Sequence, residues 1–207
     1  TAAMPLVLLV ALFLLIIWAL GRHRREVSYI LETHLPTARF IINNPRLLVA
    51  EMVTTINEAD EFIMATGGRA REDKYLKAIE NKILKNQRIE YWRVMLGERI
   101  HHRLHLHLEK LFGCPNVHIK RHKQEIYGHI LVSEERVILF FADPQPGVFG
   151  SGQILTEPGI ANRYKEFVLR LYGDRETQDI NKEEIRTLCV ECSSEVETAS
   201  MQMGEGP

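Results

Sequence analysis

Two segments of the chain carry residue types that bind metals in proteins. The segment "ERIHHRLHLHLEK" contains four histidines, and His101 and His105 in it are four residues apart. On a helix, both imidazoles would lie on one face and could share a metal ion; His102 and His105 are also three apart. The second segment, "CVEC", places Cys189 and Cys192 at the spacing of half a zinc or redox site. A metal site is predicted only if further ligands join these residues.

Each segment also has a simpler interpretation. Leu104, Leu108 and Leu111 would pack inward from the histidine-rich helix and leave its imidazoles on a partly solvated face. The same face could instead bind an adventitious metal, form a pH-sensitive interface or contact a neighbour's cofactor. The two cysteines of "CVEC" could be unpaired or incidentally oxidised thiols. We therefore assign no cofactor from the sequence.

A third group of reactive side chains lies in "EIYGHILVSEERVILFF", Glu125 to Phe141, which reads as two strands joined by a turn. The first strand carries Tyr127 and His129, and Glu134 lies at the turn. An imidazole can act as a nucleophile or general acid near neutral pH. A tyrosine hydroxyl, with an ordinary pKa of about 10, is a poor substitute for it.

From about Pro45 to Tyr172 the chain resembles the phospholipase D-like superfamily. The resemblance rests on "AEMVTTINEADEFIMATGG", on "NVHIKRH", on the hairpin just described and on "GQILTEPGIANRYKEFVLRLY". In that superfamily the hairpin carries the motif H-x-K-x4-D. The resemblance implies a phosphohistidine intermediate, a lysine that holds the phosphate, and two copies of the motif that meet in one site.

The motif is degenerate in this chain. Tyr127 stands at the histidine position, His129 at the lysine position and Glu134 at the aspartate position. A register that makes His129 the nucleophile leaves Leu131 and Arg136 at the other two positions. Neither register restores the catalytic set, so the resemblance predicts retained architecture without confident catalytic residues.

Helices and strands alternate along the part of the chain that carries these residues. Apolar spacing predicts helices over 45–58, 73–86, 98–112 and 157–172, and strands over 61–68, 88–96 and 116–122 before the hairpin. Such alternation predicts a single α/β sandwich domain with a mixed, mostly parallel sheet.

The N-terminal segment predicts a membrane anchor. From Ala2 to Leu20 there is no charged side chain, and as a helix this stretch would span roughly 28 Å, close to a hydrocarbon core. Basic residues near a span favour the cytoplasmic side, and Trp fits the membrane interface. The expected interface residues are Trp18, Arg22, Arg24 and Arg25. We therefore expect a single-pass protein of the cell (inner) membrane, with its N-terminus outside and its domain in the cytoplasm.

Composition divides the remaining chain. The predicted segments are an anchor over 1–21, a juxtamembrane basic segment and linker over 22–44, the α/β domain over 45–173 and an acidic tail over 174–207. The tail holds nine acidic and three basic residues, and a net charge of -1 leaves about +5 for the rest. Its composition predicts disorder unless a partner holds it. Three cysteines without the spacing of a disulfide scaffold favour a reducing compartment.

Three functions are compatible with these features. The first is a non-catalytic accessory subunit that binds other subunits of a membrane complex, such as a respiratory or photosynthetic one. The second is a phospholipase D-like phosphodiesterase that acts as a homodimer at the membrane, and the third is a metal or ligand sensor. The expected partners are the lipid bilayer and protein subunits. Nucleic acid is not expected, because "HIKRHK" lacks interleaved aromatic residues.

Overall fold

The computed structural model describes residues 37–68, 70–124, 129–140 and 151–189. The chain divides into two compact units, Thr1–Phe40 and Ile41–Pro207. The short strand β1 (Ala38–Ile41) crosses this division, in the segment that the sequence suggested was a linker. The predicted anchor, Trp18 and the three interface arginines lie outside the described residues. Among the residues that are described, no helix has the length and apolar character needed to cross a membrane.

The second unit is built on one sheet, in which the described strands follow the order β7-β6-β5-β2-β3-β4-β8. The strand bounds are β2 Phe62–Thr66, β3 Glu90–Leu96, β4 Val117–His122, β5 His129–Val132, β6 Val137–Phe140, β7 Gly152–Leu155 and β8 Thr177–Asp179.

The sheet is mixed and mostly antiparallel, so the prediction of a mostly parallel sheet was wrong. Among the pairings from β7 to β8 in the described residues, β2–β3 and β3–β4 are parallel, whereas β2–β5, β4–β8, β5–β6 and β6–β7 are antiparallel. A parallel pair needs a long crossover, and the helices supply one between β2 and β3 and another between β3 and β4. The predicted β5–β6 hairpin is confirmed, with Val132 opposite Val137.

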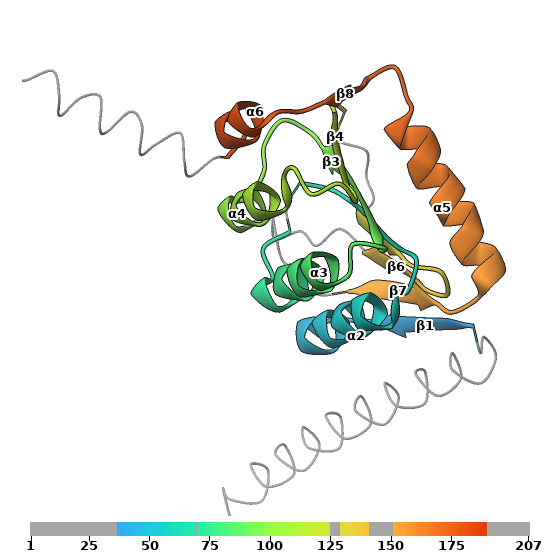
Figure 1. Ribbon diagram of the computed structural model, residues 1–207. Coiled ribbons are helices and arrows are strands. Elements are labelled where there is room, and N and C mark those ends of the chain that lie inside the picture. Colours follow the sequence, from blue (N-terminus) through green and yellow to red (C-terminus); the bar gives the residue numbers. More distant parts are fainter. Residues whose placement is uncertain (1–36, 69, 125–128, 141–150, 190–207) are drawn as a thin grey trace, which may run out of the picture. The chain divides into compact units, whose positions relative to one another are not determined.

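Helices cover both faces of the sheet (Figure 1). Helices α2 (Pro45–Glu58), α3 (Asp73–Lys85) and α4 (His102–Leu111) lie on one face, and α5 (Pro158–Tyr172) lies on the other. The Asn44 side chain accepts a hydrogen bond from the Leu47 N–H, 3.1 Å away, and so caps α2 just before Pro45. The predicted apolar face of α3 is confirmed, because Tyr75, Leu76, Ile79 and Ile83 are all buried.

Helix α4 begins later than the sequence suggested. It starts at His102 rather than Glu98, because Gly97 has φ +85° and His101 is the N-cap. The Nδ1 atom of His101 accepts a hydrogen bond from the Arg103 N–H at 3.2 Å. Residue Ile100 forms a backbone bridge with Cys189 instead of entering the helix.

The fold continues past residue 173, into the segment predicted to be a disordered tail. Strand β8 pairs antiparallel with β4, and helix α6 (Lys182–Thr187) begins with a capping box between Asn181 and Glu184. The acidic composition obscured the few apolar residues that hold this segment. Ile180, Ile185 and Leu188 are buried in the core.

Candidate functional site

His129 lies at the carboxyl end of β2, where ligand sites form in sheets with parallel strands. Strand β5 runs antiparallel to β2 with Leu131 opposite Ala65, which brings His129 beside Gly67. A Cβ atom built on Gly67 would lie 1.7 Å from Nδ1 of His129, so the imidazole rests directly on the glycine backbone. The Ile130 N–H donates to Oγ1 of Thr66 at 3.0 Å and fixes the start of β5. The imidazole therefore fills the space above this strand end.

Glu134 lies at the opposite end of β2. Its Oε1 atom accepts hydrogen bonds from the backbone N–H groups of Asp60 (3.2 Å), Glu61 and Phe62 (2.6 Å). About five residues of strand separate this point from His129, roughly 16 Å at about 3.3 Å per residue. Glu134 thus holds the start of β2, and the structure does not bring it together with His129. Tyr127 lies outside the described residues.

Replacing Glu134 by glutamine should lower the free energy of unfolding by about 1 kcal/mol, because a neutral acceptor replaces a charged one. Urea denaturation measures this change, and Glu135→Gln is the matched control because Glu135 is exposed. Equal stability of the two variants would show that Glu134 does not hold the start of β2.

A buried cation lies beneath the same strand end. Arg93, on β3, is 1% exposed, and its Nη2 atom donates to the Gly67 carbonyl oxygen at 2.6 Å. Its Nη1 atom donates to the hydroxyl of Tyr75 at 3.3 Å. No carboxylate of the described residues forms an ion pair with Arg93. Within the described residues, carbonyl and hydroxyl dipoles therefore stabilise the guanidinium in place of a carboxylate, which is unusual for a buried charge.

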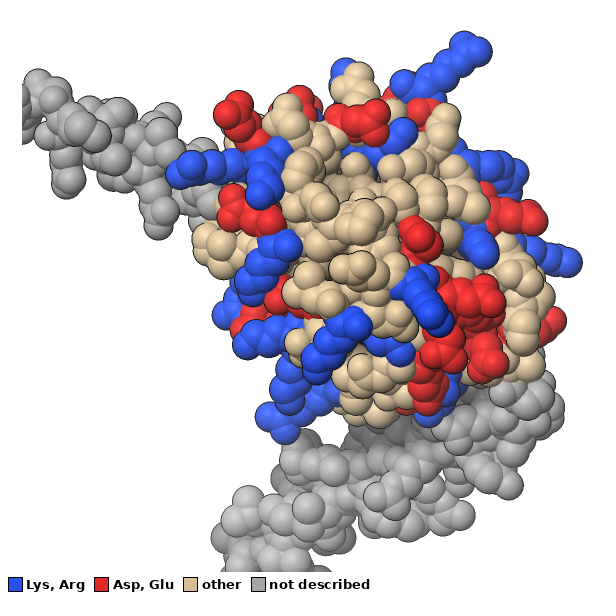
Figure 2. All heavy atoms as spheres, viewed as in Figure 1, with Lys and Arg blue, Asp and Glu red and all other residues tan. Residues whose placement is uncertain are grey.

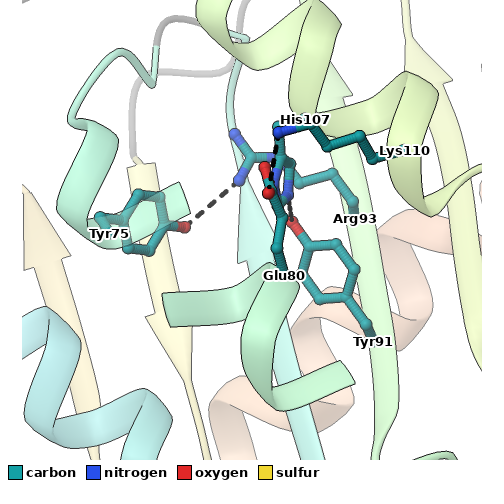
Figure 3. A network of polar contacts seen from close by, with 6 residues as sticks. All are labelled: Tyr75, Glu80, Tyr91, Arg93, His107 and Lys110. Carbon is teal, nitrogen blue, oxygen red and sulfur yellow. Dashed lines mark hydrogen bonds and ion pairs between the residues drawn. The ribbon is translucent and has the colours of Figure 1, made fainter. Parts of the chain in front are cut away.

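A chain of polar contacts continues from this cation toward the surface (Figure 3). The Tyr91 hydroxyl lies 3.4 Å from Nε2 of His107, Nδ1 of His107 lies 3.2 Å from Oε1 of Glu80, and Nζ of Lys110 lies 3.1 Å from Oε2 of Glu80. These residues come from β3, α3 and α4. They tie both helices to strand β3.

The directions of the pKa shifts indicate which of these polar groups carry protons. The hydrogen bond from His107 holds the pKa of Glu80 below its ordinary value, so Glu80 is ionised. Burial lowers the pKa of His107, which is therefore neutral and donates from Nδ1. Its Nε2 atom then accepts from Tyr91, whose pKa burial raises. Because Tyr91 and His107 are both buried, this series of polar contacts stabilises the fold and does not contact a substrate.

The metal-binding residues predicted from sequence are arranged differently in the structure. His101 caps α4, whereas His102, His105 and Cys189 place one ligand atom each within 4.8 Å of one another. The three-residue spacing of His102 and His105 was visible in the sequence. Cys189 was also a candidate ligand, but its position beside these two histidines was not predicted, because its segment was interpreted as a separate tail. Cys192 lies outside the described residues. Cys189 is disulfide-bonded, which is the oxidised one of the two states expected for these thiols.

Sequence reasoning missed the buried polar chain. The signal was an arginine and a tyrosine, Arg93 and Tyr91, on the same side of an alternating strand. Their positions identify a buried polar face only when the partners on α3 and α4 are known.

Comparisons with known proteins show the fold. No protein-family model and no curated protein matches the sequence. Among solved structures, NucT from Helicobacter pylori is similar with a TM-score of 0.57 and 11% identity, over 69% of this chain and 98% of that one. Phosphatidylserine synthase from Haemophilus influenzae is similar with a TM-score of 0.56 and 12% identity, over 73% of this chain and 42% of that one.

TrmBL2, an archaeal chromatin protein described with a novel mode of DNA binding, is similar with a TM-score of 0.53 and 9% identity. The match covers 80% of this chain and 65% of TrmBL2, so this chain spans less than two thirds of that protein. NucT and the synthase have phospholipase D folds, and their similarity at such low identity concerns the fold alone. The described domain therefore has the phospholipase D-like α/β fold.

Proposed function

We propose that this chain is a non-catalytic phospholipase D-like protein, anchored by one N-terminal helix in the cell membrane, that binds partner subunits of a membrane complex. The observation that carries the proposal is the position of His129. Its imidazole rests on Gly67 at the strand end, and the register that aligns Tyr127 with the motif histidine puts His129 at the lysine position.

The charges around this position support binding without turnover. A phosphohistidine mechanism needs an accessible nucleophile and a cation that contacts the phosphoryl group. Among the described residues, Arg93 is the cation that contacts Gly67, and it is buried and already donates to the Gly67 carbonyl oxygen. Glu134 is engaged by three backbone N–H groups at the far end of β2.

The surface charges are compatible with a protein partner. On the face shown in Figure 2, Lys and Arg side chains are interspersed with Asp and Glu side chains, so this face does not present a single charge sign. The fold is shared with TrmBL2, whose description names DNA binding. A binding role on this fold is therefore reasonable, and the mixed charge favours protein over nucleic acid on this face.

The full chain, purified in mild detergent, should release no product from a generic phosphodiester such as bis-p-nitrophenyl phosphate between pH 5 and pH 9. His129→Ala should leave this background unchanged. The same preparation should retain partner proteins in stoichiometric amounts.

Turnover that disappears in His129→Ala, with circular dichroism unchanged, would overturn the proposal. It would favour the alternative of a homodimeric phosphodiesterase. If the chain purifies as a monomer without partner proteins, the accessory-subunit role is wrong. Only the absence of catalysis would then remain of the proposal.

A further inference from the structure

Three potential metal ligands converge where α4 begins and the described chain ends. His102 and His105 lie on α4, and Cys189 follows α6; their ligand atoms are all within 4.8 Å of one another. The Sγ atom of Cys189 lies 3.8 Å from Nδ1 of His102. In tetrahedral zinc sites, nitrogen and sulfur ligands are roughly 3.5 Å apart, given bond lengths of about 2.0 and 2.3 Å.

The backbone holds these side chains near each other before any metal arrives. The Ile100 N–H donates to the Leu188 carbonyl oxygen at 2.9 Å, and Ile100 pairs with Cys189 in a parallel bridge. Leu188 and Cys189 are buried against the core cluster. Since His102 is only two residues beyond Ile100, the two segments meet in a fixed register.

The surroundings resemble those of a zinc ligand set. Oε1 of Glu109 lies 3.4 Å from Nε2 of His105, one helical turn away. Carboxylates next to metal-binding imidazoles orient the ring and raise its basicity. His105 and Cys189 are buried, whereas His102 is half-buried and gives the cluster a side toward solvent.

We propose that His102, His105 and Cys189 bind Zn²⁺ when Cys189 is reduced, and that its disulfide prevents binding. Imidazole and thiolate are the ligands that zinc prefers, and the fourth tetrahedral position is left for water or another ligand. The proposal does not depend on whether the domain is catalytic. The segment that contains Cys189 would then be held either by a disulfide or by a metal ion.

The change from the disulfide to the zinc-binding state requires a reductant, for which a dithiol is sufficient. The dithiol transfers two electrons to the disulfide, the S–S bond breaks, each sulfur takes up one proton, and the dithiol becomes a disulfide. Zinc then binds the Cys189 thiolate, and the thiol proton is released to solvent.

The test uses the full chain, prepared without a histidine tag and titrated with Zn²⁺ against a chromophoric chelator. With a phosphine reductant present, one equivalent should bind. Binding should weaken more than about 100-fold in His102→Ala, His105→Ala and Cys189→Ser, beyond the 10–100-fold typical of outer-shell residues. Glu109→Gln should lose about tenfold.

Two matched variants control for residue type. His101→Asn keeps an N-cap but removes a neighbouring imidazole, and Cys114→Ser removes a thiol that lies outside the cluster. Both should bind zinc like the parent chain. Substitution with Co²⁺ should give a thiolate charge-transfer band that Cys189→Ser abolishes.

Several results would overturn the proposal. The first two are binding of less than half an equivalent of zinc by the reduced chain, and zinc affinity that is the same with the disulfide intact. The other two are a cobalt–thiolate band that survives in Cys189→Ser, and a loss of zinc affinity in His101→Asn equal to that in His102→Ala. Circular dichroism and a second substitution, His102→Gln, separate a lost ligand from a lost fold.

Discussion

Gly67→Ala should destabilise the domain by about 3 kcal/mol and displace the imidazole of His129. Gly67 has φ +106°, a conformation that costs a non-glycine residue about 1–3 kcal/mol. The new methyl group would also lie 1.7 Å from Nδ1 of His129, and overpacking adds about 1–3 kcal/mol. Urea denaturation gives the loss of stability, and the His129 ring resonances in an NMR spectrum report the displacement.

Gly113→Ala separates the two contributions. Gly113 also has a left-handed backbone, with φ +94°, but a Cβ atom there would meet nothing within 4 Å. It should therefore cost only the backbone strain, about 1–2 kcal/mol. In a His129→Ala background, Gly67→Ala should cost the same as Gly113→Ala, which gives a coupling of about 1–2 kcal/mol between Gly67 and His129.

If Gly67→Ala is no more destabilising than Gly113→Ala, the imidazole does not rest on the strand end. The argument against catalysis at His129 would then lose its main support, because the space above Gly67 would be open to a ligand.

Local periodicity was sufficient to predict most helices and strands of the domain. The buried residues of α3, Tyr75 through Ile83, and the buried leucines of α4 follow the predicted helical spacing. The hairpin was also visible, because Ile130 and Val137 belong to two apolar runs separated by a polar turn. These features depend on neighbours within a few residues, which a single sequence contains.

Features that depend on distant residues could not be predicted in this way. The direction of β5 relative to β2 depends on how the chain returns to the sheet, and sequence spacing does not define it. Likewise, β8 and α6 are held by a few buried residues, such as Ile180 and Ile185, among mostly charged neighbours, so their composition resembled a tail. The cluster of His102 with Cys189 joins residues 87 positions apart.

Glu80→Ala should lower the free energy of unfolding by about 3 kcal/mol. The change leaves the buried N–H of His107 without its acceptor and releases Nζ of Lys110, and removing one partner of a buried pair is strongly destabilising. The side chains of Glu80 and His107 are 14% and 1% exposed.

The chain contains a matched pair for comparison. His118 and Glu90 form the same kind of contact at 2.6 Å, but their side chains are 30% and 45% exposed. Glu90→Ala should therefore cost less than about 1 kcal/mol. If the two alanine variants lose equal stability in urea, burial does not strengthen the Glu80 contact.

The contact between Glu80 and His107 also makes the free energy of unfolding depend on pH in a defined direction. Burial lowers the pKa of His107 below its ordinary 6.5, so the folded state favours neutral imidazole, and stability falls as pH decreases below 6.5. The hydrogen bond with His107 lowers the pKa of Glu80 below its ordinary 4.5. The contribution of Glu80 is therefore present above pH 4.5 and lost as pH falls through its folded pKa.

The free energy of unfolding should accordingly be constant above about pH 7 and decline in two stages below it. His107→Gln retains a donor for Glu80 but cannot be protonated, so it should remove the first stage, which begins near pH 6.5, and keep the second. Urea denaturation of both proteins at pH 8, 6, 5 and 4 measures each stage. If the first stage survives in His107→Gln, it comes from another histidine. The assignment of His107 as a neutral link between Tyr91 and Glu80 would then be wrong.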